Sequence, residues 1–75
     1  MPVEVVLDRR LSMTAIRLYG MLRRGHSLEE VATMMNANIE HLRRAERALI
    51  RLGYIERVVT RRRSASDVFY NFPET

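Results

Sequence analysis

The sequence contains no cysteine and no lysine, and it lacks any long apolar run. Without cysteine no disulfide can form, and His26 and His41 alone do not supply the ligands of a structural zinc site. The absence of cysteine also fits a reducing cytoplasm, where we expect the protein to reside. No apolar stretch approaches the roughly 20 residues needed to cross a bilayer, so we expect no membrane association. Residues 1–7 lack a basic lead, and we expect no signal peptide.

Features that support enzymatic catalysis are also missing. The sequence has no glycine-rich phosphate-binding loop and no Ser/His/Asp set with a supporting scaffold. The adjacent carboxylates of Glu29 and Glu30 are accounted for by helix capping, and a 75-residue chain offers little volume for a substrate pocket. We therefore expect no enzymatic activity, no cofactor, no metal ion and no small-molecule ligand.

The charge of the chain is carried by arginine. All thirteen basic residues are arginine, against nine acidic residues, which gives a formal net charge of +4. They cluster at residues 43–51 and 57–63, and the planar guanidinium group suits phosphates and guanine edges. A basic balance of this kind is one expected footprint of a nucleic-acid-binding protein. A basic membrane-surface helix would also need a wide exposed apolar face with bulky aromatics, which we do not find.

The chain is long enough for a single domain with a small core. Residues 3–7 have strand-forming side chains without clear alternation, so we expect a short edge strand or an extended arm within residues 1–10. Ser12 is a natural N-cap for a helix that continues to about Arg24 and ends at Gly25. The apolar positions of this helix are Ala15, Leu18, Tyr19 and Leu22.

A capping box marks the start of a second helix. Ser27 and Glu30 have the spacing at which each side chain can bond the backbone amide of the other. Leu28, Val31, Ala32 and Met35 form the apolar stripe. The helix is expected to stop near Asn36, and residues 36–38 then form a tight turn, because asparagine tolerates a positive φ angle.

The third expected helix, residues 39–52, divides into two faces at 100° per residue. One face is apolar, with Leu42, Ala45, Leu49 and Leu52, and the opposite face carries Glu40, Arg43, Arg44, Arg47 and Arg51. Asn38 is a suitable N-cap and Gly53 a suitable terminator. Four arginines against one acid are unusual for a solvated surface helix, which normally mixes signs to form i,i+4 pairs.

A change of period after Gly53 predicts a β-hairpin within residues 54–72. Residues 54–61 are rich in strand-forming side chains, residues 62–67 are polar and turn-forming, and residues 68–72 favour a second strand, which Pro73 ends. The tip of this hairpin is basic. We expect an α+β fold of three helices, within residues 12–53, followed by the hairpin.

The order of elements and several motifs resemble bacterial winged helix-turn-helix domains of transcriptional regulators and of plasmid or phage control proteins. The resemblance rests on Leu11-Ser12-x-x-Ala15-x-x-Leu18-Tyr19-x-x-Leu22, Ser27-Leu28-Glu29-Glu30-Val31-Ala32, Arg43-Arg44-Ala45 and Leu49-x-x-Leu52-Gly53-Tyr54-Ile55-Glu56-Arg57. It implies a single winged-helix domain over residues 1–75. The chain departs from the pattern at Asn36 and Asn38, where Gly and Ser or Thr are usual, and at Glu46, where an apolar residue is common.

The resemblance also implies roles for individual side chains. In a helix-turn-helix protein the N-terminal half of the third helix contacts bases, and more distant residues contact phosphates. The residues expected to read bases are Glu40, His41, Arg43 and Arg44, with Asn38 as both cap and phosphate ligand, and Arg47 and Arg51 as phosphate ligands. The residues expected at the wing tip, on the backbone or in the minor groove, are Arg61, Arg62, Arg63 and Ser64.

The sequence thus predicts sequence-specific binding of double-stranded DNA, as in a transcriptional regulator. A replication-origin or partition module, and a winged-helix interaction domain that binds an acidic protein, remain alternatives. The arginine face and the basic tip could also serve solvation alone. Because the core is small, a homodimer would add stability, with residues 3–7 adding a strand to another subunit.

Overall fold

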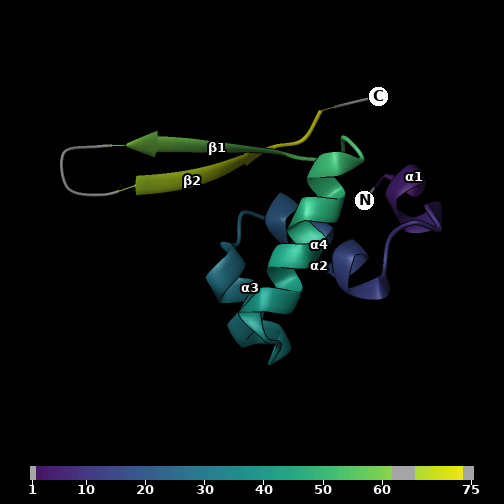
Figure 1. Cartoon of the computed structure of the whole chain (residues 1–75), viewed down its shortest axis with the longest axis horizontal. Coiled ribbons are helices and arrows are strands. Elements are labelled where there is room, and N and C mark those ends of the chain that lie inside the picture. Colours follow the sequence, from purple (N-terminus) through teal and green to yellow (C-terminus); the bar gives the residue numbers. More distant parts are fainter. Residues whose placement is uncertain (1, 62–65, 74–75) are drawn as a thin grey trace.

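The computed structural model of the protein describes residues 2–61 and 66–73, in which four helices precede a two-stranded antiparallel sheet (Figure 1). The elements are α1 (Val3–Leu7), α2 (Met13–Arg23), α3 (Leu28–Met35), α4 (Ile39–Arg51), β1 (Glu56–Arg61) and β2 (Ser66–Asn71). The predicted α+β class is confirmed, and α2, α3, α4 and the hairpin lie where the sequence places them. The presence of α1 brings the helices to four rather than three.

The prediction of a strand or extended arm at residues 3–7 is wrong, because this segment forms α1. Val5 is 1% exposed, and the phenol of Tyr54 donates hydrogen bonds to the carbonyl of Glu4 (3.4 Å) and to Oδ2 of Asp8 (2.7 Å). The hairpin points away from α1 (Figure 1), and the strand pairing in the described residues joins β1 and β2 alone. Strand propensity is therefore overridden by tertiary packing, and strand addition to another subunit is no longer available to this segment.

The helix boundaries follow from local hydrogen bonds that the sequence predicts. The hydroxyl of Ser12 accepts from the backbone N–H of Ala15 (3.1 Å), and both bonds of the Ser27–Glu30 capping box are present. The amide oxygen of Asn38 accepts from the N–H of Glu40 (2.9 Å). These caps satisfy amide groups that have no partner within their own helix.

The short turn between α3 and α4 depends on Asn36, which has φ = 50° in the left-handed region. An asparagine tolerates this conformation better than most side chains. Gly53 has φ = 81° just after α4, where the chain turns toward the hairpin. The relative orientation of α3, α4 and β1 is therefore set by two residues suited to a positive φ.

The core lies between α2, α3 and α4, with α1 and the root of the hairpin closing it. Its buried apolar residues are Val5, Leu11, Ala15, Leu18, Tyr19, Leu22, Leu28, Val31, Leu42, Ala45, Leu49 and Ile55. The Tyr19 ring packs edge-to-face with Tyr54 and Phe72 at centroid distances of 6.4 and 5.5 Å. These contacts hold the root of the hairpin, while its far end projects beyond the helices (Figure 1).

The register of the hairpin determines which side chains share a face. Arg57 lies opposite Tyr70 and Val59 opposite Val68, so these residues and Arg61 lie on one face of the sheet. The second strand begins at Ser66, earlier than predicted, so part of the expected loop 62–67 belongs to β2. The expected tip residues Arg62, Arg63 and Ser64 lie outside the described residues.

Two further properties concern the described residues. No helix within residues 2–61 is both long and apolar enough to span a membrane. In the same part of the chain and in residues 66–73, no group of three or more His, Cys, Asp or Glu side chains could hold a metal ion.

The packing of α1 can be tested with two neighbouring valines. Val5→Ala removes buried methyl groups and should lower the free energy of unfolding by about 2 kcal/mol. Val6 is 50% exposed, so Val6→Ala should change it by less than about 0.5 kcal/mol. Denaturant unfolding of both variants measures the difference, and equal losses would contradict the docking of α1.

Candidate functional site

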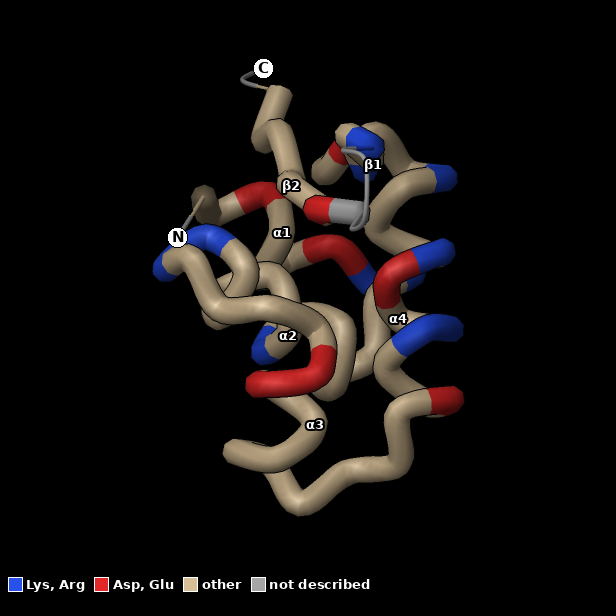
Figure 2. Tube along the Cα trace, turned by 90° about the vertical axis from the view of Figure 1, so that its left-hand side faces the viewer, with Lys and Arg blue, Asp and Glu red and all other residues tan. Residues whose placement is uncertain are grey.

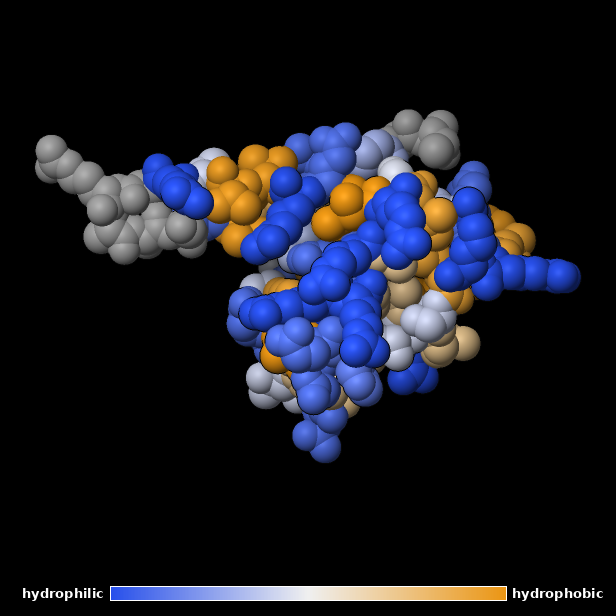
Figure 3. Space-filling model, in the orientation of Figure 1, coloured by the Kyte–Doolittle hydropathy of each residue, from blue (hydrophilic) through white to orange (hydrophobic). Residues whose placement is uncertain are grey.

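The exposed face of α4 is the main concentration of positive charge in the described chain. Leu42 and Leu49 are fully buried, which turns the opposite side of the helix outward. Arg43, Arg44 and Arg47 are exposed on that side, and Arg51 continues it at the C-terminal end. Figure 2 shows the Arg positions of α4 along the outer edge of the molecule, and Figure 3 shows hydrophilic side chains gathered over the same helix.

Most of this charge has no ion-pair partner among residues 2–61 and 66–73. Arg43 forms an ion pair with Glu40 (3.2 Å), but both side chains are more than half exposed, so the pair contributes little. Arg44, Arg47 and Arg51 make no hydrogen bond or ion pair with other described residues. Like charges spaced i,i+4 destabilise a helix by about 0.2–0.5 kcal/mol per pair. Repulsion among these arginines therefore destabilises the helix, and a bound anion would relieve it.

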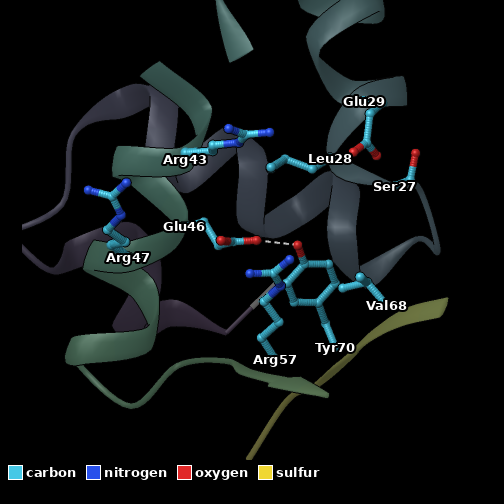
Figure 4. A pocket seen from close by; sticks show the side chains of 9 residues that line it. All are labelled: Ser27, Leu28, Glu29, Arg43, Glu46, Arg47, Arg57, Val68 and Tyr70. Carbon is cyan, nitrogen blue, oxygen red and sulfur yellow. Dashed lines mark hydrogen bonds between the residues drawn. The ribbon is translucent and has the colours of Figure 1, made fainter. Parts of the chain in front are cut away.

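A hollow beside α4 brings helix and hairpin arginines together. This hairpin hollow, of about 370 Å³, is lined by Ser27, Leu28, Glu29, Arg43, Glu46, Arg47, Arg57, Val68 and Tyr70 (Figure 4). Arg43 extends toward it from α4 and Arg57 from β1, and Arg47 lines its edge on α4. Because Arg61 lies on the same sheet face as Arg57, part of the hairpin charge faces the side occupied by α4.

Glu46 and Tyr70 connect α4 to the hairpin through a buried polar contact. Glu46 is 6% exposed, and the phenol of the half-buried Tyr70 donates a hydrogen bond to its Oε2 (Figure 4). Burial, followed by the hydrogen bond to Glu46 and the charge of Glu46, raises the pKa of Tyr70 above its usual value, against the opposing charge of Arg57. The pair holds β2 against the side of α4 that carries Glu46.

Neither Glu46, Tyr70 nor Arg57 was identified as a site residue from the sequence. Glu46 occupies a helix position where an apolar residue is common, which signals an unusual environment without naming its partner. Tyr70 lies 24 residues further along the chain. Arg57 belongs to the arginine cluster at 57–63, but only the strand register shows which way it faces.

The other flank of α4 has a hollow of its own. This α2 hollow, of about 330 Å³, is lined by Arg10, Ser12, Thr14, His41, Arg44, Ala45 and Ala48. His41 is exposed there, rather than packed into the core. The predicted site residues of α4 are thus divided, with Arg43 and Arg47 at one hollow and His41 and Arg44 at the other.

The remaining predicted residues lie at the ends of their elements. Asn38 is exposed at the start of α4, and its amide oxygen is occupied by the cap, which leaves the amide NH₂ group to donate. Arg61 is exposed at the end of β1. No family model, curated protein or solved structure matches this chain. The function must therefore be inferred from the site itself.

The contact between Glu46 and Tyr70 predicts a coupled effect on stability. Tyr70→Phe leaves the buried carboxylate without its donor and should lower the free energy of unfolding by about 1–3 kcal/mol. Adding Glu46→Leu removes the unpaired group and should recover most of that loss. Denaturant unfolding of the two single variants and the double variant completes the cycle, and additive losses would show that the pair does not interact.

The raised pKa of Tyr70 predicts a loss of stability in alkali. A group whose pKa is higher in the folded state stabilises the protein below its unfolded pKa, here 10.0, and loses that contribution as the pH rises further. Between pH 9 and about 11.5 the wild type should therefore lose more stability than Tyr70→Phe, which keeps every other tyrosine. Parallel pH profiles from denaturant unfolding would contradict this expectation.

Proposed function

We propose that this chain is a winged helix-turn-helix domain that binds double-stranded DNA sequence-specifically, as a transcriptional regulator. The observation that supports it most is the face of α4, where exposed arginines gather and two of them, Arg43 and Arg47, line a hollow shared with Arg57. The proposed activity needs no catalytic group, metal or cofactor, and it is expected in the cytoplasm.

In this proposal α3 and α4 form the helix-turn-helix, with Asn36 in the turn, and β1 and β2 form the wing. An α-helix with its side chains is about 10–12 Å across, and the major groove of B-DNA is about 12 Å wide. α4 spans 13 residues, which corresponds to about 20 Å of helix. Its exposed face is therefore of a size to enter the groove along most of its length.

The proposed roles follow the positions along α4. Glu40, His41 and Arg43, in the N-terminal half, are proposed to contact base edges, and Asn38 to contact a phosphate through its amide NH₂ group. Arg47 and Arg51 contact phosphates further along. The wing contributes Arg57 beside α4 and Arg61 at the end of β1. Arg62, Arg63 and Ser64 are proposed to contact the DNA backbone or the minor groove as well.

An acidic protein partner is the competing function, because exposed arginines suit carboxylates as well as phosphates. A salt titration with duplex DNA separates the two. DNA binding should give a log–log slope of about −0.9 per phosphate neutralised, and failure to bind any duplex at low salt would favour the protein partner. A replication-origin or partition role would share the DNA-binding surface and differ only in the target site.

The roles of individual arginines predict different effects on specific and random DNA. After selection of a target from a random duplex pool, Arg43→Ala should weaken binding to the target by about 1–3 kcal/mol and hardly affect random duplex. Arg47→Ala should weaken both similarly and reduce the salt slope by about 0.9. Fluorescence anisotropy at several salt concentrations measures these changes.

Arg17→Ala provides the control for net charge, because it removes an exposed arginine that lines neither hollow. Its effect on affinity should be small. A loss as large as that of Arg47→Ala would indicate attraction by total charge rather than by the α4 face. A palindromic target would additionally indicate that two copies bind together.

A further inference from the structure

Of the residues that line the α2 hollow, only His41 has a base contact in the proposed function. Arg10, Ser12 and Thr14 reach it from the corner between α1 and α2, while His41 and Arg44 reach it from α4. On a helical wheel at 100° per residue, Arg43 and Arg44 lie on opposite flanks of the exposed face, and Arg47 lies near its middle. His41 and Ala48 continue the flank of Arg44. Arg44 therefore lines a hollow to which α4 and the start of α2 both contribute.

Arg10, one of the residues that line the α2 hollow, is held in place by hydrogen bonds to Asp8. Asp8 accepts from Nε (3.0 Å) and Nη2 (2.7 Å) of Arg10, and also from the phenol of Tyr54. These hydrogen bonds, led by those from Arg10, hold the pKa of Asp8 well below its usual range, so the carboxylate stays ionised near neutral pH. The guanidinium of Arg10 is thereby oriented while its side chain remains 68% exposed.

The balance of charge in the α2 hollow favours an anion. Arg10 and Arg44 supply two positive charges against the single negative charge of Asp8. Asp8 pairs with Arg10 but does not itself line the hollow. The hydroxyl of Ser12 accepts from a backbone amide, which leaves its own proton to donate. A phosphodiester oxygen suits these donors, since guanidinium–phosphate hydrogen bonds are charge-assisted.

We infer that the α2 hollow binds a backbone phosphate of the DNA strand on the flank of α4 opposite the hairpin, and that Arg44 contacts this phosphate instead of a base. The inference rests on the proposed function and adds a second phosphate site to it. A helix in the major groove has a phosphate backbone along each flank. The hairpin hollow then meets one strand and the α2 hollow meets the other, so the two strands are held from both sides of α4.

The test uses the full chain with its selected target and with random duplex. Arg44→Ala should weaken binding to both by a similar factor, about tenfold, because phosphate contacts carry no sequence information. The salt slope should fall by about 0.9. Arg9→Ala, which removes a neighbouring exposed arginine outside the α2 hollow, should have a much smaller effect. Thermal unfolding of Arg44→Ala checks that the fold is intact, and Arg44→Gln provides a second variant of similar length.

Neutral methylphosphonate substitution of single phosphates in the target identifies the contact. At one position on the strand away from the hairpin, substitution should weaken DNA binding by the wild type more than binding by Arg44→Ala, which keeps only the donors of Arg10 and Ser12. Loss of affinity by Arg44→Ala for the target alone would assign Arg44 to a base and overturn the inference, while the proposed function would stand. The inference would also be overturned if every single substitution weakens the wild type and Arg44→Ala by the same factor. A wild type that binds no duplex would overturn the proposed function itself.

Discussion

The burial of the apolar stripe of α4 is the constraint on which the rest of the structure depends. Leu42 and Leu49 are fully buried against the other helices, and the small side chain of Ala45 allows α4 to approach those helices closely. This packing fixes the rotation of α4 about its own axis, because a helix has only one apolar face to bury. The arginines on the opposite side must then face outward, in spite of their mutual repulsion.

A second, polar contact fixes where the hairpin lies relative to that helix. The hairpin alone would be marginally stable, and most of its length projects from the body (Figure 1). Phe72 packs against Tyr19 at its root, and Tyr70 bonds the buried carboxylate of Glu46. A bond between a helix and a strand limits rocking of the hairpin, which keeps Arg57 beside the arginines of α4.

The two hollows, one on each flank of α4, bring arginines of neighbouring elements beside those of the helix. Each is formed where α4 meets a different neighbour, the hairpin on one flank and the α1–α2 corner on the other. Arginine is suited to such places because its planar fork forms directed hydrogen bonds as well as supplying charge. The proposed DNA complex uses this arrangement to hold both strands, while Glu40, His41 and Arg43 in the N-terminal half of α4 contact base edges.

The sequence by itself determined the three longer helices, their caps, the turn at Asn36 and the existence of the hairpin, because each depends on residues close together in the chain. It also determined that the arginines of α4 lie opposite its apolar stripe. Only the tertiary structure decided that residues 3–7 form a helix, that Glu46 meets Tyr70, and that Arg57 joins the α4 arginines. These features depend on contacts between segments distant in sequence, which periodicity and capping patterns do not contain.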